Sequence, residues 1–331
     1  MWTVDSEEVR IMSGIENHLS RMYIPTLRIV MTSVCNGECF FCHREGNSQC
    51  KKSIQQMSLD TIEKEIIPAI NRIGISKVIF TGGEPTMHDE IATAIQMVKR
   101  MCNNVQVGIT TNGFNLKKIE NAKECIDRIT ISSSSLKEDV YMRYTKINPL
   151  ILIDELRVFD NSKKSVSIVI TMENINELEE MVDLYLKNNF DVKLQFIISE
   201  SKKQDIDWER KVLYNLIKKY GKFEVKLETT PTLYKKVNGS NIRIKLASLN
   251  MWMYDNLLLR NICMNCEKRG ECVERGCAVR IFPDGKVTPC LNHFKLFSTQ
   301  NILANLETAY RALEIRENDL FSNHEKLEQL F

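Results

Sequence analysis

Three cysteines lie within eight residues of one another near the start of the chain. They are Cys35, Cys39 and Cys42, in the sequence Ser-Val-Cys-Asn-Gly-Glu-Cys-Phe-Phe-Cys. The C-x3-C-x2-C spacing brings three thiolates, which are soft metal ligands, to one short loop. An iron–sulfur cubane normally takes four cysteines, so three from one loop indicate a cluster with one iron left open. The alternatives are a zinc site, which normally uses paired C-x2-C ligands, and three incidental thiols.

The residues before the cysteines are predicted to position them. Residues 26–31 are β-branched and apolar apart from Arg28, a pattern typical of a buried strand. The cysteine loop is therefore expected at the C-terminal end of a strand, where parallel α/β folds place their chemistry. A charge such as Arg28 on this strand must be paired or must point into a cavity.

The cysteine motif, with the aromatic Phe41 before its last cysteine, resembles the signature of the radical S-adenosylmethionine (radical SAM) superfamily. The resemblance implies a [4Fe–4S] cluster on Cys35, Cys39 and Cys42, whose open iron is chelated by S-adenosylmethionine (SAM). It also implies reductive cleavage of SAM to a 5′-deoxyadenosyl radical, which abstracts hydrogen from a small-molecule or peptide substrate. The partners implied are that substrate and a reductant such as flavodoxin or ferredoxin.

Three further strand ends carry residues that fit this superfamily. The apolar run 76–80 ends in Thr-Gly-Gly-Glu-Pro, and the runs ending at 113 and 134 place small polar groups at their ends. Glycine allows backbone to approach a ligand closely, and a carboxylate can pair with an ammonium. For an isolated Gly-Gly-Glu-Pro an ordinary turn would be the better interpretation. The resemblance assigns SAM contacts to Phe41, Gly82, Gly83, Glu84, Pro85, Asn112 and Ser132.

The alternation of strand and helix patterns predicts the fold. The expected strands are 26–31, 76–80, 107–113, 128–134, 166–171 and 192–198, and the expected helices are 58–72, 88–101, 116–125, 174–189 and 208–220. Such alternation predicts a parallel sheet with helices outside it. Six units are fewer than the eight of a closed barrel, so an α/β fold with a partial (β/α)6 TIM barrel is expected.

The expected organisation has three parts. An N-terminal segment covers residues 1–22, the partial barrel covers 23–230, and a small cysteine-rich domain covers 231–331. Cysteines of the last part are Cys263, Cys266, Cys272, Cys277 and Cys290. Their spacing is compatible both with a zinc ribbon and with an auxiliary iron–sulfur cluster.

Residues 277–291, which contain a hairpin-forming Asp-Gly pair, resemble the cluster segment of the GTP 3′,8-cyclases of molybdenum-cofactor biosynthesis. Related enzymes with a twitch or SPASM domain share it. The resemblance implies a second [4Fe–4S] cluster in this domain. Its expected ligands are Cys263, Cys266, Cys272 and Cys290, with Cys277 as the spare thiol or as the alternative to Cys272.

The resemblance to the GTP 3′,8-cyclases extends to substrate residues. Arg28 and Arg280 fall on two positions that bind the GTP triphosphate in that family, and Thr111 falls on a nearby polar position. Two arginines facing one site predict a substrate with an anionic group.

Other positions depart from that family. Ile79 and Ala278 stand where it carries arginine, and Val166 or a neighbour stands where it carries lysine. The chain ends in Glu-Gln-Leu-Phe where the cyclases have a Gly-Gly tail. The leading hypothesis is therefore a related radical SAM enzyme with another substrate, and GTP 3′,8-cyclase activity is the alternative.

Composition narrows the class of protein. The 331 residues are 43% hydrophobic and 27% charged with a net charge of +2, so no strong field favours nucleic acid or a membrane as partner. Eleven cysteines without a recognisable secretion signal predict a reducing compartment, with the cytoplasm as the expected location. A non-catalytic iron–sulfur or zinc protein is the third hypothesis, which the Gly-Gly-Glu-Pro motif disfavours.

Overall fold

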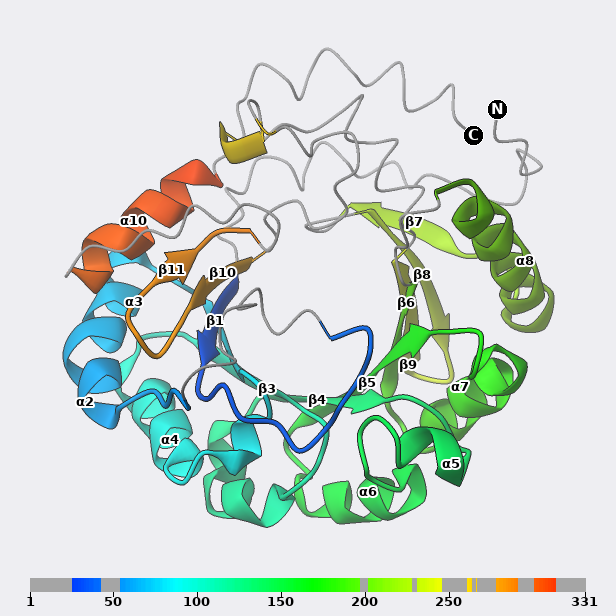
Figure 1. The fold of residues 1–331 in the computed structure, drawn as a ribbon, viewed down its shortest axis with the longest axis horizontal. Coiled ribbons are helices and arrows are strands. Elements are labelled where there is room, and N and C mark those ends of the chain that lie inside the picture. Colours follow the sequence, from blue (N-terminus) through cyan, green and yellow to red (C-terminus); the bar gives the residue numbers. More distant parts are fainter. Residues whose placement is uncertain are drawn as a thin grey trace. The chain divides into compact units, whose positions relative to one another are not determined.

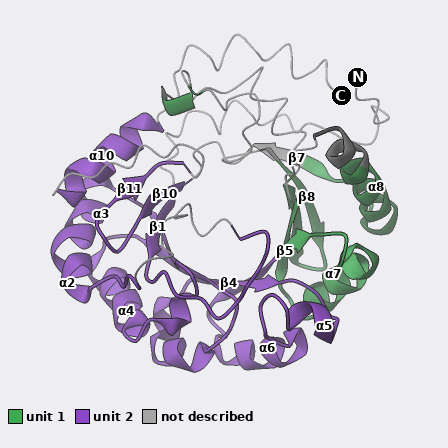
Figure 2. Cartoon of the chain, viewed as in Figure 1, with its two compact units in different colours: residues 1–23, 168–275, 314–331 green, residues 24–167, 276–313 purple. Residues whose placement is uncertain are grey.

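A computed structural model gives the fold of the chain. It describes residues 26–42, 54–196, 202–227, 231–245, 261–263, 266, 278–290 and 301–313. The chain forms two compact units, which Figure 2 colours separately. Unit 1 comprises residues 1–23, 168–275 and 314–331, and unit 2 comprises residues 24–167 and 276–313.

Unit 2 is an α/β structure in which strands and helices alternate along the chain (Figure 1). Its first strands are β1 (Thr26–Val30), β2 (Lys77–Thr81), β3 (Gln106–Thr111), β4 (Arg128–Ser133) and the first part of β5 (Lys163–Ile170). Neighbouring strands from β1 to β4 pair in parallel, in the order of the sequence. The prediction of a parallel sheet is confirmed for this unit.

Several of the helices between these strands begin or end at residues with recognisable caps. They are α2 (Leu59–Thr61), a π-helical turn (Ile62–Ile66), α3 (Ile67–Ile73), α4 (Ile91–Met101), α5 (Glu138–Tyr141) and α6 (Pro149–Glu155). The Ser58 side chain accepts a hydrogen bond from Thr61 N at the start of α2, and α3 ends at Gly74, whose φ is 76°. Asn148 caps α6, and Pro149 opens it.

One expected helix has a different geometry. Residues Leu116–Cys125 form a 3₁₀ helix, whose buried side chains are Leu116, Ile119 and Ala122. These apolar residues recur every third position, which matches three residues per turn better than 3.6. The helix expected over 88–101 starts only at Ile91, because Pro85–Met87 forms a separate 3₁₀ turn.

The two faces of the unit 2 sheet differ in chemistry. One face carries aliphatic and aromatic side chains that are at most 1% exposed, namely Leu27, Ile29, Val78, Phe80, Val107, Ile109, Ile129 and Ile131. Helices such as α3 and α4 lie on the outer side of the strands in Figure 2. The other face carries the polar register neighbours Thr110 and Thr130, and Thr130 Oγ1 hydrogen-bonds Ser165 Oγ at 2.8 Å. A closed barrel normally fills its interior with branched aliphatic residues, so this polar face is suited to a ligand.

A hairpin from far along the sequence completes the sheet of unit 2. Strand β10 (Ala278–Ile281) pairs in parallel with β1, and β11 (Val287–Thr288) pairs antiparallel with β10. The turn between them contains Gly285 with a φ of 78°, so the predicted Asp-Gly hairpin is confirmed. Helix α10 (Ile302–Ala312) follows in the same unit. The proposed boundaries at 22, 230 and 231 remain predictions.

Unit 1 has mixed strand directions. Its strands lie in the order β6 (Asp191–Phe196), β9 (Ser240–Lys245), β8 (Pro231–Val237) and β7 (Glu224–Leu227). Strands β6 and β9 are parallel, whereas β8 runs antiparallel to both β9 and β7. Helices α7 (Leu178–Lys187) and α8 (Lys202–Tyr220) accompany them, and Tyr220 joins the two through a 2.8 Å hydrogen bond to Asp183. Of the helices described, none is long and apolar enough to cross a bilayer.

Candidate active site at the strand ends of unit 2

The end of β2 lies directly against the segment that leads into the first cysteine. Gly83 N donates to Thr32 O and Glu84 N donates to Val34 O, each at 2.7 Å. A Cβ on Gly82 would lie 2.5 Å from Thr32 O, and one on Gly83 would lie 2.1 Å from Val34 O. Only glycine fits at this distance, because real Cβ atoms do not approach backbone oxygen so closely. The Gly-Gly pair therefore joins the two predicted motifs into one structure.

Glu84 is a buried acid at the centre of this edge. Its side chain is 1% exposed and accepts four hydrogen bonds. Oε1 accepts from Thr86 N at 3.0 Å, from Thr86 Oγ1 at 2.7 Å and from Thr111 Oγ1 at 2.5 Å. Oε2 accepts from Asn112 N at 2.7 Å. The carboxylate therefore ties the end of β2 to the end of β3.

The electrostatics of Glu84 are unusual for so buried a group. Burial raises the pKa of Glu84, and the hydrogen bonds from Thr111, Asn112 and Thr86 oppose that rise. Within the described ranges no lysine, arginine or histidine forms an ion pair with it. A buried carboxylate without a cation is costly, so a positively charged ligand beside it would be stabilised.

The three thiols of the cysteine loop lie in one neighbourhood, and none is in a disulfide. Cys35 and Cys42 are exposed and Cys39 is half-buried. Burial raises the pKa of Cys39 to about 12, and the neighbouring thiols of Cys42 and Cys35 add to the rise. Gly37 N donates a 3.3 Å hydrogen bond to Cys35 Sγ, the kind of contact that tunes cluster sulfurs.

The chemistry of these thiols suits a cubane, which takes soft thiolate ligands. In the part of the chain that is described, no group of three His, Cys, Asp or Glu side chains is arranged to hold one metal ion. A cubane does not need such convergence, because each thiolate binds a different iron. Iron would also keep the thiolates deprotonated, which the raised pKa values of Cys35 and Cys39 otherwise oppose.

Asn112 connects the third strand to the cysteine loop. Its side-chain amide donates to Asn36 Oδ1 at 2.8 Å, and its own Oδ1 accepts from Phe114 N at 2.9 Å. Phe41 packs edge-on against Phe40 at a centroid distance of 5.1 Å. Ser132 is half-buried on β4. The structure thus brings Glu84 and Asn112 together with the loop; the assignment of SAM contacts to these residues remains a prediction.

Arg28 and Arg280 emerge from the same face of the sheet. They are register partners on the parallel strands β1 and β10, so their side chains are neighbours. Arg28 Nη2 donates to Thr81 Oγ1 at 3.0 Å, and the buried Arg280 donates from Nη1 to Ala278 O at 3.3 Å. Thr111 is the third residue expected to contact substrate. Its hydroxyl donates a hydrogen bond to the Glu84 carboxylate, and its side chain is 2% exposed.

The expected auxiliary ligands are described only in part. Cys263 and Cys266 belong to unit 1, where Cys266 N donates to Cys263 O at 3.3 Å. Cys290 belongs to unit 2, where it follows β11 in the sequence and is buried. Cys272 and Cys277 lie outside the described residues. The second cluster is therefore still a prediction.

Sequence reasoning missed several residues that build this site. Thr86 gives Glu84 two of its hydrogen bonds, and Asn36 links Asn112 to the loop. Asn36 lies between two of the predicted ligands, so its place in the motif was a usable signal. Tyr144, which contacts the loop although more than 100 positions separate them, had no such signal, because its role arises only from the fold.

Comparisons with known proteins define the class. Residues 29–185 match the Radical SAM superfamily. The matched segment contains both the cysteine loop and the Gly-Gly-Glu-Pro motif, so this part of the chain carries the radical SAM domain that the motifs predicted.

Its named relatives are GTP 3′,8-cyclases. A probable GTP 3′,8-cyclase of Thermococcus kodakarensis is 32% identical over 201 residues, which is 58% of this chain and 63% of that protein, less than two thirds of its length. The GTP 3′,8-cyclase of Alkaliphilus oremlandii is 28% identical over 277 residues, 80% of each chain. Among solved structures, Streptococcus suis SuiB bound to S-adenosylmethionine has a TM-score of 0.60 at 17% identity, covering 95% of this chain and 68% of SuiB. At that identity the likeness to SuiB shows the fold, a radical SAM α/β fold.

Proposed function

We propose that this chain is a catalytic radical SAM enzyme that acts on an anionic substrate. The observation that carries the proposal is the direct contact between the Gly-Gly-Glu-Pro motif and the segment that leads into the cysteine motif. Gly83 lies against Val34, so the end of β2 and the cysteine loop form one site. A bound [4Fe–4S] cluster and SAM would supply reductive cleavage to a 5′-deoxyadenosyl radical. A non-catalytic cluster carrier has no need of the second motif.

Different residues would bind the cluster and SAM. Cys35, Cys39 and Cys42 would hold the cluster through their thiolates. Burial raises the pKa of the Cys35 thiol, and the negative charge of the nearby Glu84 adds to that rise. SAM carries an ammonium and a sulfonium, so this uncompensated negative charge favours SAM over an anionic ligand at the strand end.

The substrate class follows from the arginine pair. Guanidinium groups present planar sets of donors that match a carboxylate or phosphate, so two neighbouring arginines suit an anionic group. Arg28 and Arg280 occupy paired register positions on the polar side of the sheet, which supports a joint role. Peptides and small metabolites that carry a carboxylate or phosphate both belong to this class of anionic substrates.

GTP 3′,8-cyclase activity is the second candidate, and the named relatives favour it. The departures from the cyclase sequence argue against it, and one of them lies beside Arg28 in the sheet. Ile79 is the register neighbour of Arg28 on β2, so an apolar residue occupies a place beside the arginine pair. Charge-assisted hydrogen bonds contribute about 1.5–3 kcal/mol each, so missing phosphate contacts would weaken triphosphate binding substantially.

One experiment tests both candidates. The anaerobically reconstituted protein is incubated with SAM and dithionite, with and without GTP, and 5′-deoxyadenosine and nucleotide products are measured. We expect 5′-deoxyadenosine from the wild type and none from the Cys35→Ala/Cys39→Ala/Cys42→Ala variant, which should lose half of about eight irons per chain. Cys102→Ala, which removes a buried thiol elsewhere in unit 2, is the matched control.

Each outcome decides between the hypotheses. A wild type that makes no 5′-deoxyadenosine supports a non-catalytic protein, and a triple variant that still makes it removes the cluster assignment. Conversion of GTP to a cyclised product establishes the second candidate. Zinc in place of half the iron refutes only the auxiliary cluster.

A further inference from the structure

The cysteine loop is held by a segment that contains none of the superfamily motifs. All three residues between Cys35 and Cys39 contact residues 144–146. Asn36 Nδ2 donates to Thr145 O at 3.3 Å, and Glu38 N donates to Tyr144 O at 3.0 Å. Gly37 lies between them, where an added Cβ would come within 2.7 Å of Tyr144 O.

Side chains extend this contact. The ring of Tyr144 packs on Phe40 at 5.5 Å and on Phe41 at 5.9 Å between centroids. Aromatic pairs at such distances add to the stabilisation that comes from burial. Lys146 Nζ forms a 3.3 Å ion pair with Glu38 Oε1, which is exposed and contributes little. The loop is therefore held on both sides of Cys39.

The holding segment is itself well ordered by contacts. Tyr141, Tyr144 and Thr145 are at most 8% exposed. Tyr141 O accepts from Tyr144 N at 3.2 Å and from Lys146 N at 2.7 Å. Lys146 has a φ of 62°, a conformation that non-glycine residues adopt only where the surroundings enforce it. This tight turn aims the carbonyls of residues 144 and 145 at the loop.

We propose that residues 141–146, which we call the clasp, are a positioning element that shapes the cysteine loop for its cluster and slows loss of the cluster. This inference rests on the proposed function, since it assumes that Cys35, Cys39 and Cys42 hold iron. A short irregular loop loses conformational entropy when it binds metal, and contacts that order it beforehand reduce that loss. Residues around metal ligands commonly tune affinity in this way.

The test uses the full-length reconstituted protein and the variants Tyr144→Ala and Tyr144→Phe. Phenylalanine keeps the ring contacts with Phe40 and Phe41, whereas alanine removes them. Tyr214→Ala, which truncates a 67% exposed tyrosine in α8, is the matched control. The measurements are iron and sulfide per chain, the rate of iron release to a chelator and the electron paramagnetic resonance spectrum of the reduced cluster. The Cys35/Cys39/Cys42 triple variant gives the background from any other iron.

We expect Tyr144→Ala to release the loop-bound iron at least tenfold faster and to broaden the spectrum, while Tyr144→Phe and Tyr214→Ala stay within twofold of wild type. A Tyr144→Ala protein that keeps its cluster at the wild-type rate overturns the clasp and leaves the proposed function standing. A wild type that binds no iron at the loop overturns both.

Gly37→Ala tests the same contact without changing any residue of the clasp. Its added Cβ would push the loop away from Tyr144 O, so the same faster release is expected. If Tyr144→Ala fails to fold, unchanged iron release in Gly37→Ala is sufficient to reject the inference.

Discussion

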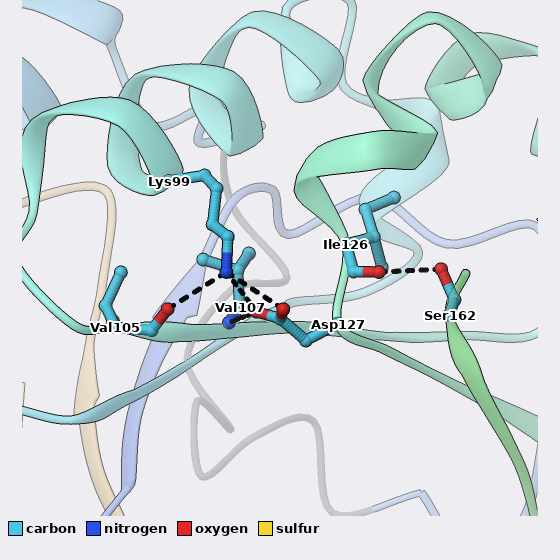
Figure 3. A network of polar contacts seen from close by, with 6 residues as sticks. All are labelled: Lys99, Val105, Val107, Ile126, Asp127 and Ser162. Carbon is cyan, nitrogen blue, oxygen red and sulfur yellow. Dashed lines mark hydrogen bonds and ion pairs between the residues drawn. The ribbon is translucent and has the colours of Figure 1, made fainter.

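Each end of the parallel sheet in unit 2 holds a carboxylate in a polar network. The carboxylate at one end is paired with a lysine, whereas the carboxylate at the other end accepts only from neutral donors. At the N-terminal ends of the strands, Lys99 Nζ lies 2.9 and 2.7 Å from the two carboxylate oxygens of Asp127 (Figure 3). The same ammonium donates to Val105 O at 3.2 Å, and Asp127 Oδ2 accepts from Val107 N at 2.7 Å. This network is neutral overall and joins α4 to the starts of β3 and β4.

At the C-terminal ends of the strands, Glu84 has four neutral donors and no cation from the described chain. It is also far more buried than Asp127, whose side chain is 41% exposed. In barrels of parallel strands the N-terminal end typically serves stability and the C-terminal end serves chemistry. The N-terminal network contains both an acid and its cation, whereas under the proposed function a bound ligand would supply the cation at the C-terminal end.

The strongest test of this contrast compares one glycine from each end. Gly83→Ala would bring its Cβ within 2.1 Å of Val34 O, so we expect displacement of the cysteine loop and loss of iron binding. Gly74→Ala at the other end has nothing within 4 Å of the new Cβ and only its φ of 76° to strain it. Its expected cost is about 1–2 kcal/mol in the free energy of unfolding, with full iron content. Equal iron content in the two variants would contradict the contrast.

Glu84→Gln removes the uncompensated charge while keeping the size of the side chain. We expect SAM affinity to fall at least tenfold in an anaerobic binding titration, because the ammonium loses its counter-charge. Iron content should be unchanged, since no cysteine contact is removed. Wild-type affinity would show that Glu84 serves only to join β2 to β3.

The arginine pair tests whether substrate binds on the polar face. Arg28→Ala is expected to abolish product formation while SAM cleavage continues without coupling to substrate. Arg280→Ala should act in the same direction, because the two residues are register partners. Assays of 5′-deoxyadenosine and product in the same samples separate the two effects. Turnover that survives both substitutions would remove the anionic-substrate proposal.

At the N-terminal end, Asp127→Asn should affect stability alone. The substitution removes the ion pair with Lys99 and weakens the bond to Val107 N, with an expected loss of about 1–3 kcal/mol in the free energy of unfolding. SAM affinity should match wild type within error. A loss of SAM affinity without a loss of stability would reverse the roles assigned to the two ends.

The smallest expected effect is a pH dependence at His88. Burial lowers the pKa of His88, whose ring accepts from Glu90 N at 3.1 Å and contacts Met57 O at 2.9 Å. Because the folded pKa lies below the unfolded value of about 6.5, the unfolded state binds more protons between the two. Stability should therefore fall as the pH drops through about 6.5 and level off below the folded pKa. Denaturant unfolding across this range should show a shallower slope for His88→Gln than for wild type.

The sequence by itself predicted the cluster ligands, the class of protein and most of the local structure. The spacing of Cys35, Cys39 and Cys42 and the Gly-Gly pair identified the superfamily, since cluster ligation and close backbone approach each demand particular residue types at fixed intervals. The alternation of apolar runs predicted the parallel sheet, because strand and helix periods differ along the chain.

Tertiary structure alone decided which residues meet. Arg28 and Arg280 are separated by more than 250 positions, and only the parallel pairing of β1 with β10 makes them neighbours. The contact between Tyr144 and the cysteine loop likewise had no local signal, since backbone carbonyls carry no sequence identity. The local sequence pattern indicates which chemical groups each segment carries. The register between distant strands is instead fixed by the packing of the whole sheet.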